Sequence, residues 1–150
     1  MTTGAAVPLP FVDEHTVTVD AGAEELWHRL VTRLDHSLSG AGGARYVRLV
    51  GGDPREAAGP RPLAEGSAYP GFRVVAAVPG RELALAGSHR FSTYSLVFRI
   101  EPLDDGRTRL AAETRAVFPG VAGRVYRLLV IGSGGHAFGM RRMLAGYREP

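Results

Sequence analysis

The stretch FSTYSLVFRIEPLDDGRTRLAAETRAVFPG, residues 91–120, decides the fold class of this chain. Two segments in which apolar and polar residues alternate, Phe91–Glu101 and Thr108–Phe118, flank the turn-forming sequence Asp104-Asp105-Gly106. Alternation with a period of two is typical of strands that bury only one face. The stretch therefore predicts an antiparallel β-hairpin.

The same alternation assigns a face to each side chain of this hairpin. The inward, mostly apolar set comprises Arg90, Ser92, Tyr94, Leu96, Phe98 and Ile100 on the first strand, and Leu110, Ala112, Thr114, Ala116 and Phe118 on the second. Arg109, Glu113 and Arg115 fall on the opposite face, where we expect a solvated surface with cross-strand ion pairs.

Upstream of the hairpin, the pattern predicts more strands and one helix. The expected strands are His15–Asp20, Arg45–Val50, Phe72–Val78 and Glu82–Ala86, and the expected helix is Ala23–Leu38, with a stripe formed by Leu26, Trp27, Leu30, Val31 and Leu34. The segment Gly51–Gly71 is rich in Gly, Pro and Ala and is expected to be a long loop.

Downstream of the hairpin, Val121–Tyr147 has helical periodicity. Its expected apolar side comprises Val125, Leu128, Leu129, Met140, Met143 and Leu144. Glycines weaken a helix by roughly 1 kcal/mol each relative to Ala, so the four glycines in residues 132–139 predict a break or kink near Gly132–Gly135. The helix is expected to cover the concave face of the sheet.

These elements predict an α+β fold in which a curved antiparallel sheet of about six strands wraps around a long C-terminal helix, with a shorter helix near the N-terminus. A length of 150 residues favours a single domain spanning residues 1–150, in which residues 1–10 form a loose arm.

The order of elements resembles the START/Bet v 1-like superfamily, also called SRPBCC or the polyketide cyclase/dehydrase and lipid-transfer group. The resemblance spans about His15 to Leu144 and is carried by residues 70–75 (PGFRVV), 87–94 (GSHRFSTY), 112–120 (AETRAVFPG) and 123–131 (GRVYRLLVI), which are similar to an uncharacterised actinobacterial-type branch. It implies a helix-grip fold, but no particular activity, because the superfamily contains carriers, receptors and cyclases.

Composition excludes several classes of function. The chain has no cysteine, so disulfides, thiol catalysis and Cys-ligated metals are ruled out. All 18 basic residues are arginines interleaved with 15 acidic ones, so nucleic-acid binding is not expected. The five histidines are too widely separated to suggest a metal site, and no cofactor is expected. Without a signal sequence or a long apolar run, we expect a cytoplasmic protein that does not insert stably into membranes.

The segment Gly132-x-Gly134-x-x-Ala137 formally matches the dinucleotide-binding fingerprint. That fingerprint requires a second strand and an acidic residue about 20 positions later, and only 13 residues follow Ala137. We therefore interpret the glycines as small residues that leave space between the helix and the sheet.

That space is expected to form a ligand pocket. The candidate pocket residues are Arg90, Ser92, Tyr94, Leu96, Phe98, Ala112, Thr114, Leu129, Gly132, His136 and Met140. For His136, a buried histidine bonded to a neighbour is the main interpretation, and a ligand-contacting or acid/base role is the alternative. His89 is expected at a turn or rim, and Tyr94 as a buried tyrosine bonded to the backbone.

The leading hypothesis for function is the binding of a small hydrophobic or aromatic molecule between the sheet and the C-terminal helix. One alternative is a cyclase or dehydratase that uses the same cavity, with His136, Tyr94, Arg90 or His89 transferring protons. A third is a protein-interaction role for the exposed Arg141-Arg142 pair. Whether a reaction is catalysed, and the oligomeric state, are left open by the sequence.

Overall fold

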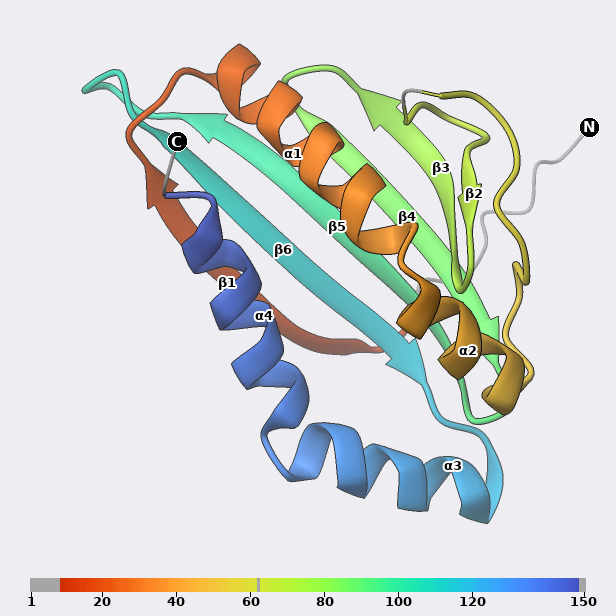
Figure 1. The fold of residues 1–150 in the computed structure, drawn as a ribbon. Coiled ribbons are helices and arrows are strands. Elements are labelled where there is room, and N and C mark those ends of the chain that lie inside the picture. Colours follow the sequence, from red (N-terminus) through yellow and green to blue (C-terminus); the bar gives the residue numbers. More distant parts are fainter. Residues whose placement is uncertain (1–8, 62, 149–150) are drawn as a thin grey trace, which may run out of the picture.

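The computed structural model describes residues 9–61 and 63–148 and is built on one antiparallel sheet (Figure 1). Its strands are β1 (Phe11–Val19), β2 (Ala68–Tyr69), β3 (Phe72–Val78), β4 (Glu82–His89), β5 (Ser92–Pro102) and β6 (Thr108–Val117). They are arranged in the order β1-β6-β5-β4-β3-β2. The predicted fold class, a curved antiparallel sheet of about six strands combined with helices, is confirmed.

The hairpin of β5 and β6 forms the centre of the sheet. Tyr94 pairs with Ala116, Leu96 with Thr114, and Phe98 with Ala112, which places the predicted inward set on one face. Gly106 adopts a φ of 82° in the connecting turn, a conformation that glycine reaches without steric cost. The predicted hairpin is therefore confirmed.

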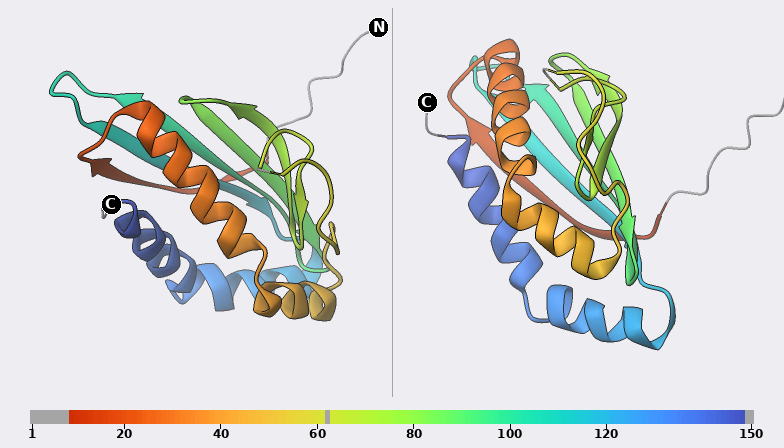
Figure 2. Two further views of the ribbon diagram at one scale, coloured as in Figure 1. Left: turned by 45° about the horizontal axis from the view of Figure 1, so that its top comes forward. Right: turned by 45° about the vertical axis from the view of Figure 1, so that its right-hand side comes forward.

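The helices lie along the concave face of the sheet (Figures 1 and 2). They are α1 (Ala23–Leu38), α2 (Ala41–Val50), α3 (Gly120–Arg127), the π-helix η1 (Leu128–Gly132) and α4 (Gly135–Gly146). Helix α1 crosses the middle of the sheet, α4 runs alongside β1, and α3 lies beyond the end of β6. Helix α1 has the bounds that its periodicity predicts.

The hydrophobic core fills the part of the molecule between α1, α4 and the sheet. Helix α1 contributes Leu26, Trp27, Leu30 and Leu34, the sheet contributes Val19, Leu83, Leu85, Phe98 and Leu110 among others, and α4 and its end contribute Met140, Leu144 and Tyr147. No described side chain of helix α2 belongs to this cluster. The core thus occupies one end of the concave face.

The prediction of a strand at Arg45–Val50 is wrong, because these residues form the second half of α2. Val47 and Val50 are buried, and their spacing of three residues places them on one side of a helix. Gly51 ends the helix in the left-handed conformation, with a φ of 67°. The aromatic and β-branched residues suggest a strand, but the burial of Val47 and Val50 on one side selects a helix.

The C-terminal segment is not one continuous helix. It breaks at Gly134, which has a φ of 79°, so the predicted break near Gly132–Gly135 is confirmed. The predicted apolar side is only half right: Met140 and Leu144 are buried, whereas Val125, Leu128 and Leu129 are exposed. The π-helix and the break change the helical phase, so one stripe cannot continue from α3 into α4.

The opposite face of the sheet carries ion pairs. Arg99 lies 3.3 Å from Glu113 and Arg109 lies 3.0 Å from Glu101, with both arginines about half exposed. This confirms the predicted solvated face. Of the expected N-terminal arm, residues 1–8 lie outside the described residues, whereas Pro10 accepts a backbone hydrogen bond from Ala116. None of the described helices is long and apolar enough to cross a membrane.

Candidate functional site

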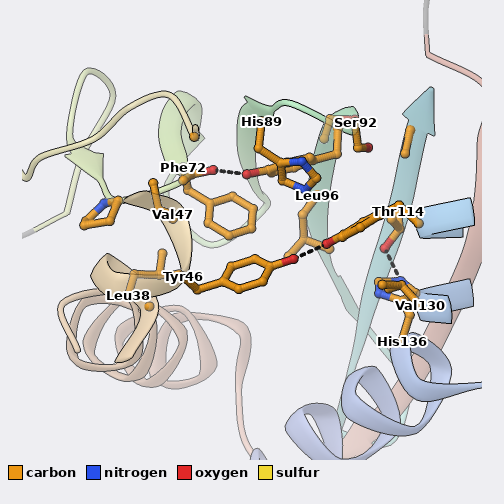
Figure 3. A pocket seen from close by; sticks show the side chains of 18 of the residues that line it. Leu38, Tyr46, Val47, Phe72, His89, Ser92, Leu96, Thr114, Val130 and His136 are labelled. Carbon is orange, nitrogen blue, oxygen red and sulfur yellow. Dashed lines mark hydrogen bonds between the residues drawn. The ribbon is translucent and has the colours of Figure 1, made fainter. Parts of the chain in front are cut away.

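A cavity of about 380 Å³ lies at the end of the concave face that the core does not fill (Figure 3). Its walls come from α2, β5, β6, the segment Tyr126–Ile131, the start of α4 and the loop before β3. Helices α2 and α3 lie at this same end of the molecule (Figures 1 and 2), and both contribute side chains to the cavity wall. The cavity has the size of a small-ligand site.

The lining of this cavity is largely apolar and carries no formal charge on Asp, Glu, Lys or Arg. Its aliphatic and aromatic members are Leu38, Tyr46, Val47, Phe72, Tyr94, Leu96, Ala116, Phe118, Tyr126, Val130, Ile131 and Met140. The polar members are hydroxyl groups and the imidazoles of His89 and His136. Burying an ionised ligand against such a surface would leave its charge unpaired, so the lining favours a neutral ligand.

Aromatic rings gather around His89 at the end of β4. The centroid of its imidazole lies 4.9 Å from that of Tyr126, 5.6 Å from Tyr94, 6.0 Å from Phe91 and 6.4 Å from Tyr46. These distances lie within the range of favourable aromatic contacts. The cluster brings together side chains from α2, β4, β5 and α3, and forms one wall of the cavity.

The position of the proton on His89 follows from one hydrogen bond. The backbone N–H of Phe91 donates to Nδ1 of His89 at 3.1 Å, so Nδ1 carries a lone pair. Burial lowers the pKa of the imidazole below its ordinary value of 6.5, which favours the neutral ring at pH 7. The proton of the neutral ring therefore sits on Nε2, and among the described residues no group accepts it.

Three tyrosine hydroxyls in the cavity wall are already bonded within the protein. Tyr94 donates to the carbonyl oxygen of Gly71 at 2.6 Å, and burial raises its pKa to about 12. The hydroxyls of Tyr46 and Tyr126 bond each other and connect α2 to α3 across the cavity (Figure 3). Burial and this bond also raise the pKa of Tyr126. Tyr94 and Tyr126 therefore stay protonated at neutral pH.

His136 at the start of α4 is held by two partners. Its Nε2 lies 3.2 Å from Oγ1 of Thr114 and 3.3 Å from Oδ1 of Asp13, whose other oxygen lies 3.1 Å from Nε2 of His15. This cluster fastens α4 to β1 and β6. It matches the main interpretation of His136 as a histidine bonded to its neighbours, although the ring also lines the cavity.

Six of the eleven predicted pocket residues line the cavity, namely Ser92, Tyr94, Leu96, Thr114, His136 and Met140. All belong to β5, β6 and α4. Their meeting at one place follows from the hairpin register and from the packing of α4 against β1 and β6.

The other five predicted residues lie elsewhere. Phe98 and Ala112 are fully buried in the sheet, nearer the core. Arg90 is exposed in the turn after β4, where the strand alternation no longer applies. Leu129 and Gly132 are exposed because the π-helix turns them away from the cavity. These five assignments are corrected by the geometry.

Sequence reasoning missed most of the cavity's outer wall. Tyr46 and Val47 were assigned to a strand, and Tyr126, Val130 and Ile131 were not distinguished from their neighbours on the final helix. The signal that could have placed the first two is Gly51, a helix-ending glycine directly after Val50. His89, expected at a turn or rim, is the last residue of β4 before the turn and also lines the cavity.

Every buried side-chain nitrogen or oxygen atom in the described part of the chain has a hydrogen-bond partner. Within residues 9–61 and 63–148, no group of three or more histidine or carboxylate side chains is arranged to hold a metal ion. The fully buried polar side-chain atoms of the described residues are therefore all bonded within the protein, and the polar groups left for a ligand are those exposed to the cavity.

Comparison with known proteins shows the fold and nothing finer. No protein-family model matches the sequence, and no curated protein does. Among solved structures, the chain is similar to CalU16 from Micromonospora echinospora, with a TM-score of 0.54 and 16% identity over 91% of this chain and 75% of that one.

Two further structures are similar over 91% of this chain. A protein from Nitrosospira multiformis has a TM-score of 0.57 and 12% identity over 92% of its length, and one from Thermobifida fusca has a TM-score of 0.52 and 18% identity over 93% of its length. At such identities the likeness concerns the fold. It confirms the helix-grip fold that the START/Bet v 1-like resemblance implies, whereas the branch stays a prediction.

Proposed function

We propose that this protein binds one small, neutral, aromatic molecule between the sheet and helices α2, α3 and α4. The observation that carries this proposal is the uncharged apolar cavity of about 380 Å³ beside a well-packed core. A cavity of this size holds a ligand of drug-like dimensions, and burial of apolar surface supplies the driving force. The proposed location is the cytoplasm.

Binding without chemistry is favoured over catalysis by the state of the polar groups. Tyr94 and His136, the best candidates for proton transfer, are bonded to Gly71 and to Asp13 and Thr114. The phenol of Tyr94 donates to the protein and stays protonated at neutral pH, so of these two side chains only Nδ1 of His136 is left to act as a general acid or base. Nε2 of His89 carries a proton, has no acceptor among the described residues and can therefore orient a ligand by donating to it.

The test uses the fluorescence of N-phenyl-1-naphthylamine, a neutral aromatic probe, on purified protein. We expect saturable binding by the wild type. Ala116→Trp places a large side chain in the cavity and should weaken binding by about tenfold or more. The matched control is Ala111→Trp on the same strand, which the alternation of β6 directs to the opposite face.

Native mass spectrometry of the freshly purified protein complements this titration, because a co-purifying small molecule would identify the ligand class. Circular dichroism shows whether each variant is folded. Equal binding by the wild type and a folded Ala116→Trp variant would contradict the proposal, as would an absence of saturable binding by the wild type.

A further inference from the structure

Helix α3 and the π-helix η1 expose large apolar side chains to solvent. Val121, Val125, Leu128 and Leu129 are each more than half exposed, and Phe138 of α4 is 66% exposed. Helix α3 lies beyond the end of the sheet, which leaves its outer side uncovered (Figures 1 and 2). Exposed apolar groups concentrated on one element mark an interaction site. We call the four apolar side chains on α3 and η1, with Arg124 and Arg127, the α3–η1 face.

The segment of sequence that contains this face carries charged side chains of one sign. Residues 114–148 contain six arginines and no aspartate or glutamate, whereas the other twelve arginines share the rest of the chain with all 15 acidic residues. Arg124 and Arg127, together with Arg141 and Arg142 of α4, are exposed, and none forms an ion pair with a described carboxylate. The face is therefore complementary to a surface that is both apolar and anionic.

A hollow of about 410 Å³ brings these two properties together. Arg124 and Arg127 line it beside Leu128, Ile131 and Gly132. Two guanidinium groups next to aliphatic side chains match the phosphate and the first methylene groups of an anionic lipid, because arginine binds phosphate through several parallel hydrogen bonds. This hollow is separate from the ligand cavity, although Ile131 belongs to both.

We propose that the α3–η1 face docks on the surface of an anionic lipid bilayer. An amphipathic helix with arginines beside an apolar stripe lies in the membrane interface without spanning it. The inner side of the same segment, through Tyr126, Val130 and Ile131, forms the wall of the ligand cavity. Docking would therefore bring the ligand cavity to the membrane, where an apolar ligand dissolves. This consequence rests on the proposed function.

Two other binding partners fit the α3–η1 face less well than a bilayer does. A second copy of this chain, related by twofold symmetry, would place arginines against arginines at the centre of the contact. A free phosphate ion would use Arg124 and Arg127 but would leave the apolar side chains exposed to water. The bilayer satisfies both the charge and the apolar area.

The test is co-sedimentation of the full chain with vesicles of phosphatidylcholine alone or with 30% phosphatidylglycerol. We expect binding only to the anionic vesicles, with a loss at 0.5 M salt, because exposed charges are then screened. One arginine near such a membrane is worth about 1 kcal/mol, a roughly fivefold effect, so Arg124→Gln/Arg127→Gln should weaken partitioning by roughly 10- to 30-fold. Leu128→Ser/Leu129→Ser should weaken it by a comparable factor through lost apolar burial.

Two control variants remove the same kinds of side chain, two arginines or two apolar residues, from β3 and the turn that follows it. Arg73→Gln/Arg81→Gln removes two exposed positive charges, and Val75→Ser/Val78→Ser removes two exposed apolar side chains. Both controls should bind like the wild type. Binding unaffected by the α3–η1 variants, or reduced equally by the controls, would overturn the proposal.

Two further measurements distinguish bilayer docking from an ion site and from a self-interface. Competition by inorganic phosphate at constant ionic strength would indicate an ion site, and a dimer that the Leu128→Ser/Leu129→Ser variant dissociates would indicate a self-interface; either result overturns bilayer docking. Titration with N-phenyl-1-naphthylamine in the absence of vesicles tests the cavity separately. Intact probe binding without vesicle binding therefore contradicts docking alone, and the reverse result contradicts the proposed function alone.

Discussion

The imidazole of His89 places a hydrogen-bond donor at one end of the apolar cavity, which would orient a bound ligand. Its Nδ1 accepts a hydrogen bond from Phe91, which leaves the Nε2 proton for a ligand. A planar ligand in contact with the surrounding rings would therefore place a carbonyl or another acceptor at this end of the cavity. The hydroxyl of Tyr94 donates to Gly71, whereas the Tyr46–Tyr126 pair uses only one of its two O–H protons and keeps a second donor near His89, whose ring centroid lies 4.9 Å from that of Tyr126.

His89→Phe tests this role, because it keeps an aromatic ring and removes the donor. We expect the affinity for an aromatic ketone to fall by about 2- to 10-fold, the value of one hydrogen bond, while the affinity for the hydrocarbon of the same shape stays within about twofold. Isothermal titration calorimetry with the two ligands measures both. An equal loss of affinity for both ligands would show that His89 acts through packing and not through a hydrogen bond.

The lowered pKa of His89 also predicts a pH dependence of stability. Burial lowers this pKa from 6.5 in the folded state, so between the folded and unfolded pKa values the unfolded chain binds more protons. The free energy of unfolding should therefore decrease as the pH falls below 6.5. Urea unfolding at pH 7.5 and pH 5.5 should show a larger loss for the wild type than for His89→Phe. A smaller loss of the free energy of unfolding in the wild type than in His89→Phe would contradict a buried imidazole with a lowered pKa.

Among the elements of the fold, the break between η1 and α4 depends on Gly134. Its φ of 79° is strained for any residue with a Cβ atom, even though no heavy atom lies within 4 Å of where that Cβ would be. Gly134→Ala should lower the free energy of unfolding by about 1–2 kcal/mol through backbone strain alone. Chemical denaturation measures this change.

Gly139 provides the control for this prediction. It lies within α4, has ordinary helical geometry and has open space around it. Gly139→Ala should raise the free energy of unfolding by about 0.5–1 kcal/mol, because alanine loses less conformational entropy in a helix. Similar effects of both substitutions would mean that the break does not depend on a left-handed residue.

The elements that the sequence predicted correctly are those whose pattern is local. The β5–β6 hairpin follows from alternation and a turn sequence, and α1 follows from a 16-residue helical period. Helix α2 was mistaken for a strand because its composition favours strands, and only tertiary packing decides between the two. The faces of α3 and η1 could not be predicted, because a π-turn shifts the helical phase without a distinct sequence signal.

The same limit applies to the candidate site. Ser92, Tyr94, Leu96 and Thr114 could be predicted, because strand alternation determines which way they point. Tyr46 and Tyr126 could not, because they are 80 residues apart and meet only once α2 and α3 are placed. The part of the cavity formed by the sheet was therefore predictable, and the part formed by the helices was not.

Over the molecule as a whole, one end of the concave face is packed with the hydrophobic core and the other end borders the cavity. Helices α1 and α4 fill one end with the hydrophobic core, which holds the sheet in its curved form. Helices α2 and α3 close the other end without filling it. This division predicts that blocking the cavity changes binding more than stability, since Met140 is the one buried residue of the core cluster that also lines the described cavity.

The proposed ligand occupies the space between β5, β6 and the helices, and its position there can be observed directly. Intermolecular nuclear Overhauser effects between a bound aromatic probe and assigned methyl groups locate the probe. We predict contacts with Leu96, Val130 and Met140, which line the cavity. Contacts only with Leu128 and Leu129, whose side chains are exposed to solvent, would place the probe on the surface and contradict binding in the cavity.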